Sequence, residues 1–124
     1  MAHPPVMLNT LRVVRGQSKR FRITVRRKSG ARAKLPSNSR FVFTVARAGS
    51  VVFIKTSDDG GIKLIDAENG VATLDLEVED TEKLEAGTSI YDLWLDLGGS
   101  PPKREPLEEN GQLIVSERVT PFGS

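Results

Sequence analysis

Cysteine is absent from this sequence and histidine occurs once, as His3, and these shortages exclude several kinds of chemistry. Without cysteine the chain has no disulfide, no thiol nucleophile, no iron–sulfur cluster and no cysteine-based zinc site. One imidazole does not make a histidine-based metal site. The 124 residues must therefore be held by a hydrophobic core, which a single domain of this length can bury.

Long apolar runs are also missing. No stretch approaches the ~18 apolar residues that a membrane helix needs, and the start, residues 1–5, lacks the charged and apolar regions of a signal peptide. The sequence therefore predicts a protein that is made and folded in a cytoplasm.

Acidic residues do not occur in the first part of the chain. Residues 1–57 hold thirteen Lys or Arg and no Asp or Glu, whereas the remaining 67 residues hold five bases and all sixteen acids. The formal charges are +13 and −11, although the whole chain is only +2. Such a split predicts either pairing between the two parts or a charged partner.

Apolar and polar residues alternate along most of the chain, the pattern of half-buried strands. Gly- and Asp-rich turns separate the alternating segments, and residues 80–87 predict one helical turn with Leu84 in the core. Residues 98–111 read as a polar loop. The expected strands lie near residues 20–28, 40–48, 51–56, 62–65, 71–79, 89–97 and 112–119.

These segments predict an all-β fold, an antiparallel immunoglobulin-like β-sandwich of seven or eight strands with one short helical turn. The sandwich is expected over residues 11–120. Residues 1–10, with Pro4 and Pro5, are expected to form an extended arm, and residues 121–124 a tail.

In such a sandwich the second and fifth strands pair, which offers a structural explanation of the charge split. Each cross-strand pair of opposite charge would contribute about 0.2–1 kcal/mol. The expected pairing sets Arg20, Arg22 and Arg26 beside Asp75, Glu77 and Glu79. In a functional alternative, the protein has one basic and one acidic end and stacks on its own copies or docks on a charged partner.

Trp94 falls by parity on the solvent side of its strand, between Asp92 and Asp96. A large ring there needs cover, either from an arginine or from a partner subunit. A bulge in the strand would bury it instead, and both readings remain open at this stage.

Residues 26–34 form a basic loop that contains Arg26, Arg27, Lys28 and Arg32. Such a loop could follow a nucleic-acid backbone, although basic runs often are solvated loops, and no aromatic side chain is present in it to stack on a base.

Catalytic patterns are weak. The carboxylates alternate outward along strands, and Asp58, Asp59 and Asp66 fit no calcium-loop spacing and suit turns. We therefore expect no enzyme activity, no cofactor and no metal.

The most specific motif in the chain is Asp80-Thr81-x-x-Leu84-x-x-Gly87-x-x-x-Tyr91-Asp92-Leu93-Trp94, followed by Gly111-x-Leu113-x-Val115. With it, about residues 18–120 resemble immunoglobulin-like virion proteins of tailed bacteriophages, similar to the amino-terminal domain of the phage baseplate upper protein. One departure is the stretch 34–37, where the family often has Leu-Thr-Gly.

The resemblance implies a structural protein of the virion, present in many symmetric copies, that binds other capsid, connector, tail or baseplate proteins. It does not distinguish between decoration, connector and baseplate or tail-adaptor roles. The expected docking elements are the arm 1–10, a patch of Trp94, Asp92 and Asp96, and the basic residues of the 26–34 loop. Alternatives are nucleic-acid contact through that loop and, last, a carbohydrate-binding module.

Overall fold

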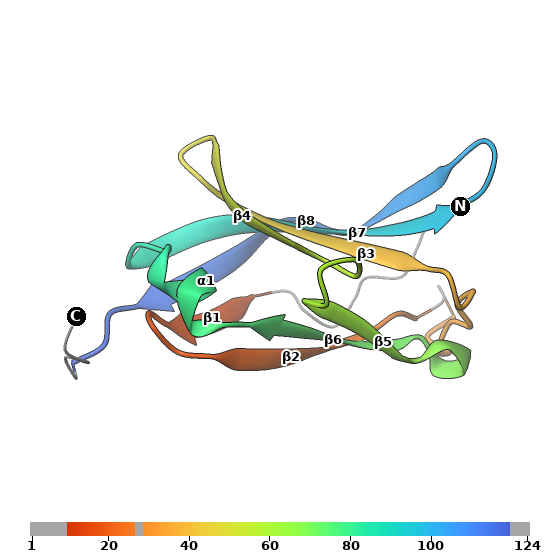
Figure 1. Cartoon of the computed structure of the whole chain (residues 1–124), viewed down its shortest axis with the longest axis horizontal. Helices are drawn as coiled ribbons and strands as arrows, with labels where there is room; N and C mark the ends of the chain where they lie inside the picture. Colours follow the sequence, from red (N-terminus) through yellow and green to blue (C-terminus); the bar gives the residue numbers. More distant parts are fainter. Residues whose placement is uncertain (1–9, 27–28, 120–124) are drawn as a thin grey trace.

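A computed structural model describes residues 10–26 and 29–119, which form two stacked β-sheets (Figure 1). Between the strands lie a 3-10 turn, η1 (Ala67–Asn69), and one short helix, α1 (Val78–Glu82). The strands are β1 (Leu11–Val14), β2 (Lys19–Thr24), β3 (Arg40–Arg47), β4 (Ser50–Thr56), β5 (Ile62–Asp66), β6 (Val71–Leu76), β7 (Gly87–Gly98) and β8 (Lys103–Ser116).

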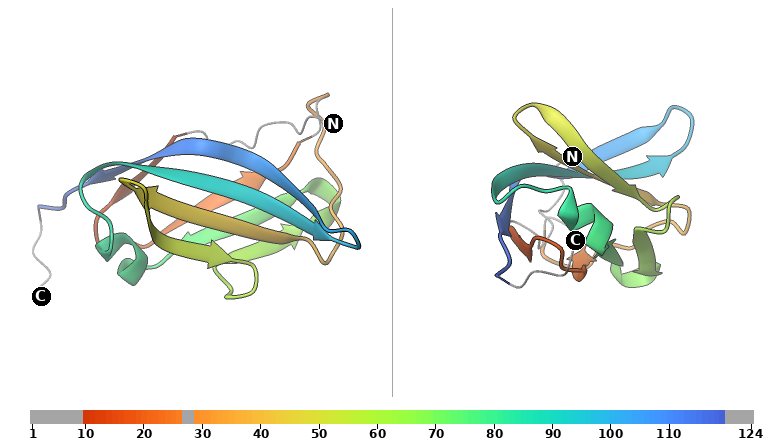
Figure 2. Two further views of the ribbon diagram at one scale, coloured as in Figure 1. Left: turned by 90° about the horizontal axis from the view of Figure 1, so that it is seen from above. Right: turned by 60° about the vertical axis from the view of Figure 1, so that its left-hand side comes forward.

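The larger sheet has the strand order β1-β8-β7-β3-β4 and the smaller one the order β2-β6-β5. Neighbouring strands are antiparallel, except that β1 runs parallel to β8. Figure 2 shows the two layers and the α1 turn at one end of the sandwich. The expected all-β, immunoglobulin-like sandwich is therefore confirmed.

The core lies between the layers, where the inward-facing residues of both sheets meet. Phe43 of β3 packs against Tyr91 of β7, with ring centroids 5.3 Å apart, and against Phe53 of β4, at 6.4 Å. Ile23 and Leu74 of the smaller sheet are likewise fully buried. Each such side chain stabilises the fold by about 1.5–3 kcal/mol.

The segment after β6 differs from the expectation of a strand through residue 79. β6 ends at Leu76, and Val78, expected to face the core, is 47% exposed in α1. The helix begins early because Glu77, its N-cap residue, forms a capping box with Asp80, whose carboxylate accepts a hydrogen bond of 2.8 Å from the Glu77 N–H. Leu84 is buried, as predicted.

The predicted polar loop over residues 98–111 is also wrong, because β8 extends from residue 103 and forms a long hairpin with β7. Pro106 obscured this strand in the sequence. β1 pairs only with residues 113–116 of β8, so Pro106 lies where that edge of β8 is open, a place where strands tolerate proline.

Both predicted terminal segments fall almost wholly outside the described residues. Within the described residues, no helix is long and apolar enough to cross a membrane.

Candidate interaction surfaces

The outer face of the five-stranded sheet carries large apolar side chains where a solvated sheet usually carries polar ones. Cross-strand register places Val42 of β3 opposite Trp94 of β7, and Thr44 opposite Ile54 of β4. We call this surface the apolar face; it is formed by Val42, Val51, Ile54, Ile90, Trp94 and Ile114.

Several members of the apolar face are well exposed. Val51 is 60% exposed, Ile54 49% and Ile90 47%, while Trp94 is partly buried. Clusters of this kind on a soluble protein usually mark a contact surface.

Trp94 belongs to the outer face and not to the core. Its neighbours Leu93 and Leu95 are almost completely buried on the opposite side of β7. Opposite Trp94 on β8 lies Pro106, at a point where the register shifts. No cation–π contact involves Trp94 among the described residues, so the expected cover by an arginine is not seen there.

The two aspartates that flank Trp94 are already engaged within the chain. Asp92 accepts a hydrogen bond of 2.9 Å from the Asn110 N–H. Asp96 accepts one from the Gly98 N–H and forms ion pairs with Arg104 at 3.4 Å and Arg40 at 3.3 Å. These interactions, the Gly98 hydrogen bond first, outweigh burial and lower the pKa of Asp96. The expected acidic docking patch is therefore a largely apolar surface in which Asp96 is ion-paired and Asp92 is hydrogen-bonded to the backbone.

A shallow hollow of about 190 Å³ lies on the same outer face, next to Ile90. Small side chains leave this space open: Ala46 and Ala48 of the β3–β4 hairpin line one side of the hollow, and Asn110 of β8 lines another. The apolar face thus has both projecting side chains and a depression.

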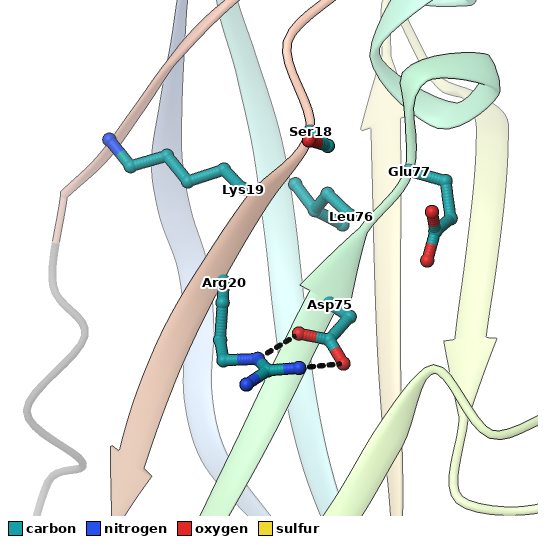
Figure 3. Close-up of a pocket in the computed structure, with 6 residues that line it drawn as sticks. All are labelled: Ser18, Lys19, Arg20, Asp75, Leu76 and Glu77. Atoms are coloured by element: carbon teal, nitrogen blue, oxygen red, sulfur yellow. Dashed lines mark hydrogen bonds and ion pairs between the residues drawn. The ribbon is translucent and has the colours of Figure 1, made fainter.

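On the smaller sheet, the predicted pairing of β2 with β6 is confirmed, but only one of the three expected ion pairs forms. The Arg20 guanidinium donates to both oxygens of Asp75, at 2.6 and 3.3 Å (Figure 3). Arg22 lies opposite Thr73 of β6, which carries no charge. Glu77 and Glu79 follow the last residue of β6, which pairs with the start of β2. Arg26 lies beyond the other end of β2, so these glutamates are not its cross-strand neighbours.

A hollow of about 350 Å³ lies around the Arg20–Asp75 pair and is lined also by Ser18, Leu76 and Glu77 (Figure 3). Its two central charges bind each other. The hollow therefore presents no unsatisfied charged group at its centre.

The charge split of the sequence is resolved by several ion pairs between its two parts. Besides Arg20–Asp75, bases of residues 1–57 pair with acids of the later residues as Arg15–Glu117, Lys34–Glu68, Arg40–Asp58, Arg47–Glu85 and Lys55–Asp80. These pairs lie on both sheets and at both ends of the sandwich. Ion pairs between the two parts of the chain therefore explain the charge split, although all of these pairs except Arg20–Asp75 differ from the expected ones.

The basic loop is only partly described, because Arg27 and Lys28 lie outside the described residues. Arg26 faces Arg32 across an antiparallel bridge, and its guanidinium donates to the Gly30 carbonyl at 3.0 Å. Two arginines in directly opposite positions repel each other.

Sequence reasoning missed most of the apolar face. A usable signal was present: Val42, Ile54 and Ile90 are apolar residues at positions that parity assigns to solvent. Tyr91, the only tyrosine of the chain, is buried in the core and does not offer its ring to a carbohydrate. Within residues 10–26 and 29–119, no group of three or more His, Asp or Glu side chains is arranged to hold a metal ion.

No protein-family model matches the sequence, and no curated protein matches it significantly. Among solved structures, the chain is similar to murine CRIg, with 10% identity, a TM-score of 0.42, and coverage of 94% of this chain and 95% of that one. It is also similar to AggA, the major subunit of aggregative adherence fimbriae type I from Escherichia coli, with 13% identity, a TM-score of 0.35, and coverage of 94% and 92%. These likenesses concern the fold alone.

Proposed function

We propose that this chain is a non-catalytic binding module that acts through contact between proteins, and that it is a structural component of a tailed-bacteriophage virion. The apolar face is the observation that carries the binding role. The virion assignment rests on the sequence motifs that resemble immunoglobulin-like phage modules.

Exposed aliphatic side chains on one sheet face favour a protein partner. The centre of an interface is typically apolar and its rim polar. The apolar face fits this anatomy, because Ile54, Ile90 and Trp94 present apolar surface from β4 and β7 and the Arg40–Asp96–Arg104 cluster lies beside it. Since those charges satisfy one another, they would not remain unpaired when a partner excludes water.

In a virion, the partners would be further copies of this chain or neighbouring capsid, connector, tail or baseplate proteins. Interface formation is the whole of the mechanism: the apolar face loses water when a second surface covers it. The protein would be made in the cytoplasm of the bacterial host and then join the particle.

Sedimentation of the full chain tests the binding role. We expect the wild type to self-associate at high concentration and the double variant Ile54→Lys/Ile90→Lys to remain monomeric. The matched control is Ile65→Lys/Val78→Lys, which adds the same charge at exposed apolar positions off this face and should associate as the wild type does. A monomeric wild type would contradict self-association, and equal behaviour of both variants would contradict the role of this face.

The genes beside the coding sequence test the virion assignment separately. We expect head, connector or tail genes there. A neighbourhood of bacterial metabolic genes would contradict the assignment while leaving the binding role in place.

A further inference from the structure

The outer face of the three-stranded sheet carries cations that the chain itself does not neutralise. Arg22 of β2 and Lys63 of β5 both lie opposite Thr73, one on each side of the central strand β6. Both side chains are exposed, and neither forms an ion pair within the described part of the chain. Two residues beyond the end of β2, Arg26 faces Arg32 across an antiparallel bridge, which brings two more cations to this end of the sheet.

We call these four residues, Arg22, Arg26, Arg32 and Lys63, the basic strip. The nearby acids are occupied elsewhere: Asp75 binds Arg20, and Glu68 lies 3.3 Å from Lys34. The hydrogen bonds from Asn69 and, after them, the charge of Arg32 lower the pKa of Asp66, so this carboxylate stays negative and partly offsets Arg32. The face still keeps a net positive charge, because Arg22, Arg26 and Lys63 form no ion pair among the described residues.

The opposed arginines add a second argument. Arg26 and Arg32 face each other across the bridge, which destabilises the free protein. An anion between or above them would remove that repulsion, so the strip favours a ligand of high negative charge density.

Strand geometry gives the dimensions of the basic strip. Arg22 and Lys63 are two strand spacings apart, about 10 Å. This length is close to the roughly 12 Å width of the major groove of B-form DNA, across which two rows of phosphates lie.

From these observations we infer that the basic strip is a second interaction surface, distinct from the apolar face, that binds the phosphate backbone of double-stranded nucleic acid without reading its sequence. Among the described residues, the strip contains no aromatic side chain that could stack on an unpaired base, so a duplex is favoured over a single strand. A protein partner typically needs a buried apolar or aromatic anchor, whereas the strip has cations around Thr73 and one exposed aliphatic side chain near them, Ile65 of β5.

Binding of the full chain to a short DNA duplex of random sequence, measured by fluorescence anisotropy over a series of salt concentrations, tests this inference. The double variant Arg22→Gln/Lys63→Gln should bind more weakly and reduce the slope of log K against log salt by about 2. The matched control is Arg12→Gln/Lys83→Gln, which removes the same charge from exposed side chains elsewhere and should leave the slope nearly unchanged.

Three outcomes would overturn the inference. One is the absence of binding at low salt. Another is an equal loss in the strip and control variants, which would indicate only a general effect of net charge. The third is tighter binding to polyglutamate than to the duplex, which would assign the strip to an acidic protein.

Discussion

The ammonium of Lys55 lies 2.9 Å from the carboxylate of Asp80, and the two side chains are only 15% and 11% exposed. Lys55 belongs to β4 of the larger sheet, and Asp80 belongs to α1, which follows β6 of the smaller sheet. This pair therefore ties the two layers together at the end of the sandwich that α1 covers.

Replacing Asp80 by alanine should destabilise the protein by about 3 kcal/mol, because it leaves Lys55 nearly buried and unpaired and removes the acceptor for the Glu77 N–H. The free energy of unfolding from chemical denaturation measures the effect. Glu79→Ala, an exposed residue of the same helix, is the control and should change stability by less than about 0.5 kcal/mol. Similar losses in both variants would show that the pair does not contribute to stability.

Gly111 should not tolerate a side chain. It lies opposite Tyr91 in the β7–β8 register, and an added Cβ would come within 2.5 Å of the Tyr91 ring. That ring is buried and packs against Phe43. Gly111→Ala should therefore cost about 1–3 kcal/mol of stability.

The matched control for Gly111→Ala is Gln112→Ala, next to it on β8 and exposed, which should have little effect in the same denaturation experiment. In the variant Tyr91→Leu, the additional cost of Gly111→Ala should be smaller, because the atoms that clash are gone. An unchanged cost in that background would contradict the explanation.

Stability should fall in alkaline solution through two groups whose pKa is raised. Burial, and then the negative charge of Glu108, raise the pKa of Tyr91 well above its ordinary value of 10.0. Burial alone would lower the pKa of Lys55 below 10.5, but the hydrogen bond and the charge of Asp80 outweigh it, so that pKa is raised. The folded state then holds more protons than the unfolded state above about pH 10, and stability decreases as pH rises.

Tyr91 is the only tyrosine, so tyrosinate absorbance reports on it alone. We expect this absorbance to appear together with the loss of β-sheet circular dichroism, in one transition. Ionisation near pH 10 with the circular dichroism unchanged would contradict the burial of the hydroxyl.

Much of the core was predictable because period-two alternation directly encodes which side of a strand is buried. Phe41, Phe43 and Leu93 follow that rule and are fully buried. The ends of strands were less predictable, since they depend on contacts between distant residues. The capping box between Glu77 and Asp80 ends β6 early, and the pairing with β7 extends β8 through Pro106.

The candidate surfaces were only partly predictable for a similar reason. Parity placed Trp94 on the outer face correctly, but charge partners depend on register, which a single sequence does not specify. Arg22 meets Thr73 and not an acid, while Asp96 binds Arg40, which is 56 residues away along the chain. A face can be recognised as apolar or basic only after such pairs are known.

Truncation of two adjacent residues of β7 should affect different properties, stability at one position and association at the other. Leu93→Ala opens a cavity in the core, since Leu93 is fully buried, and should cost about 2–5 kcal/mol of stability. Trp94→Ala removes a partly exposed ring from the apolar face and should leave a folded protein with a cooperative thermal transition but weaker association. Thermal unfolding and sedimentation of both variants measure the two effects. Loss of the cooperative transition in Trp94→Ala would show that the ring supports the fold and is not chiefly a contact for partners.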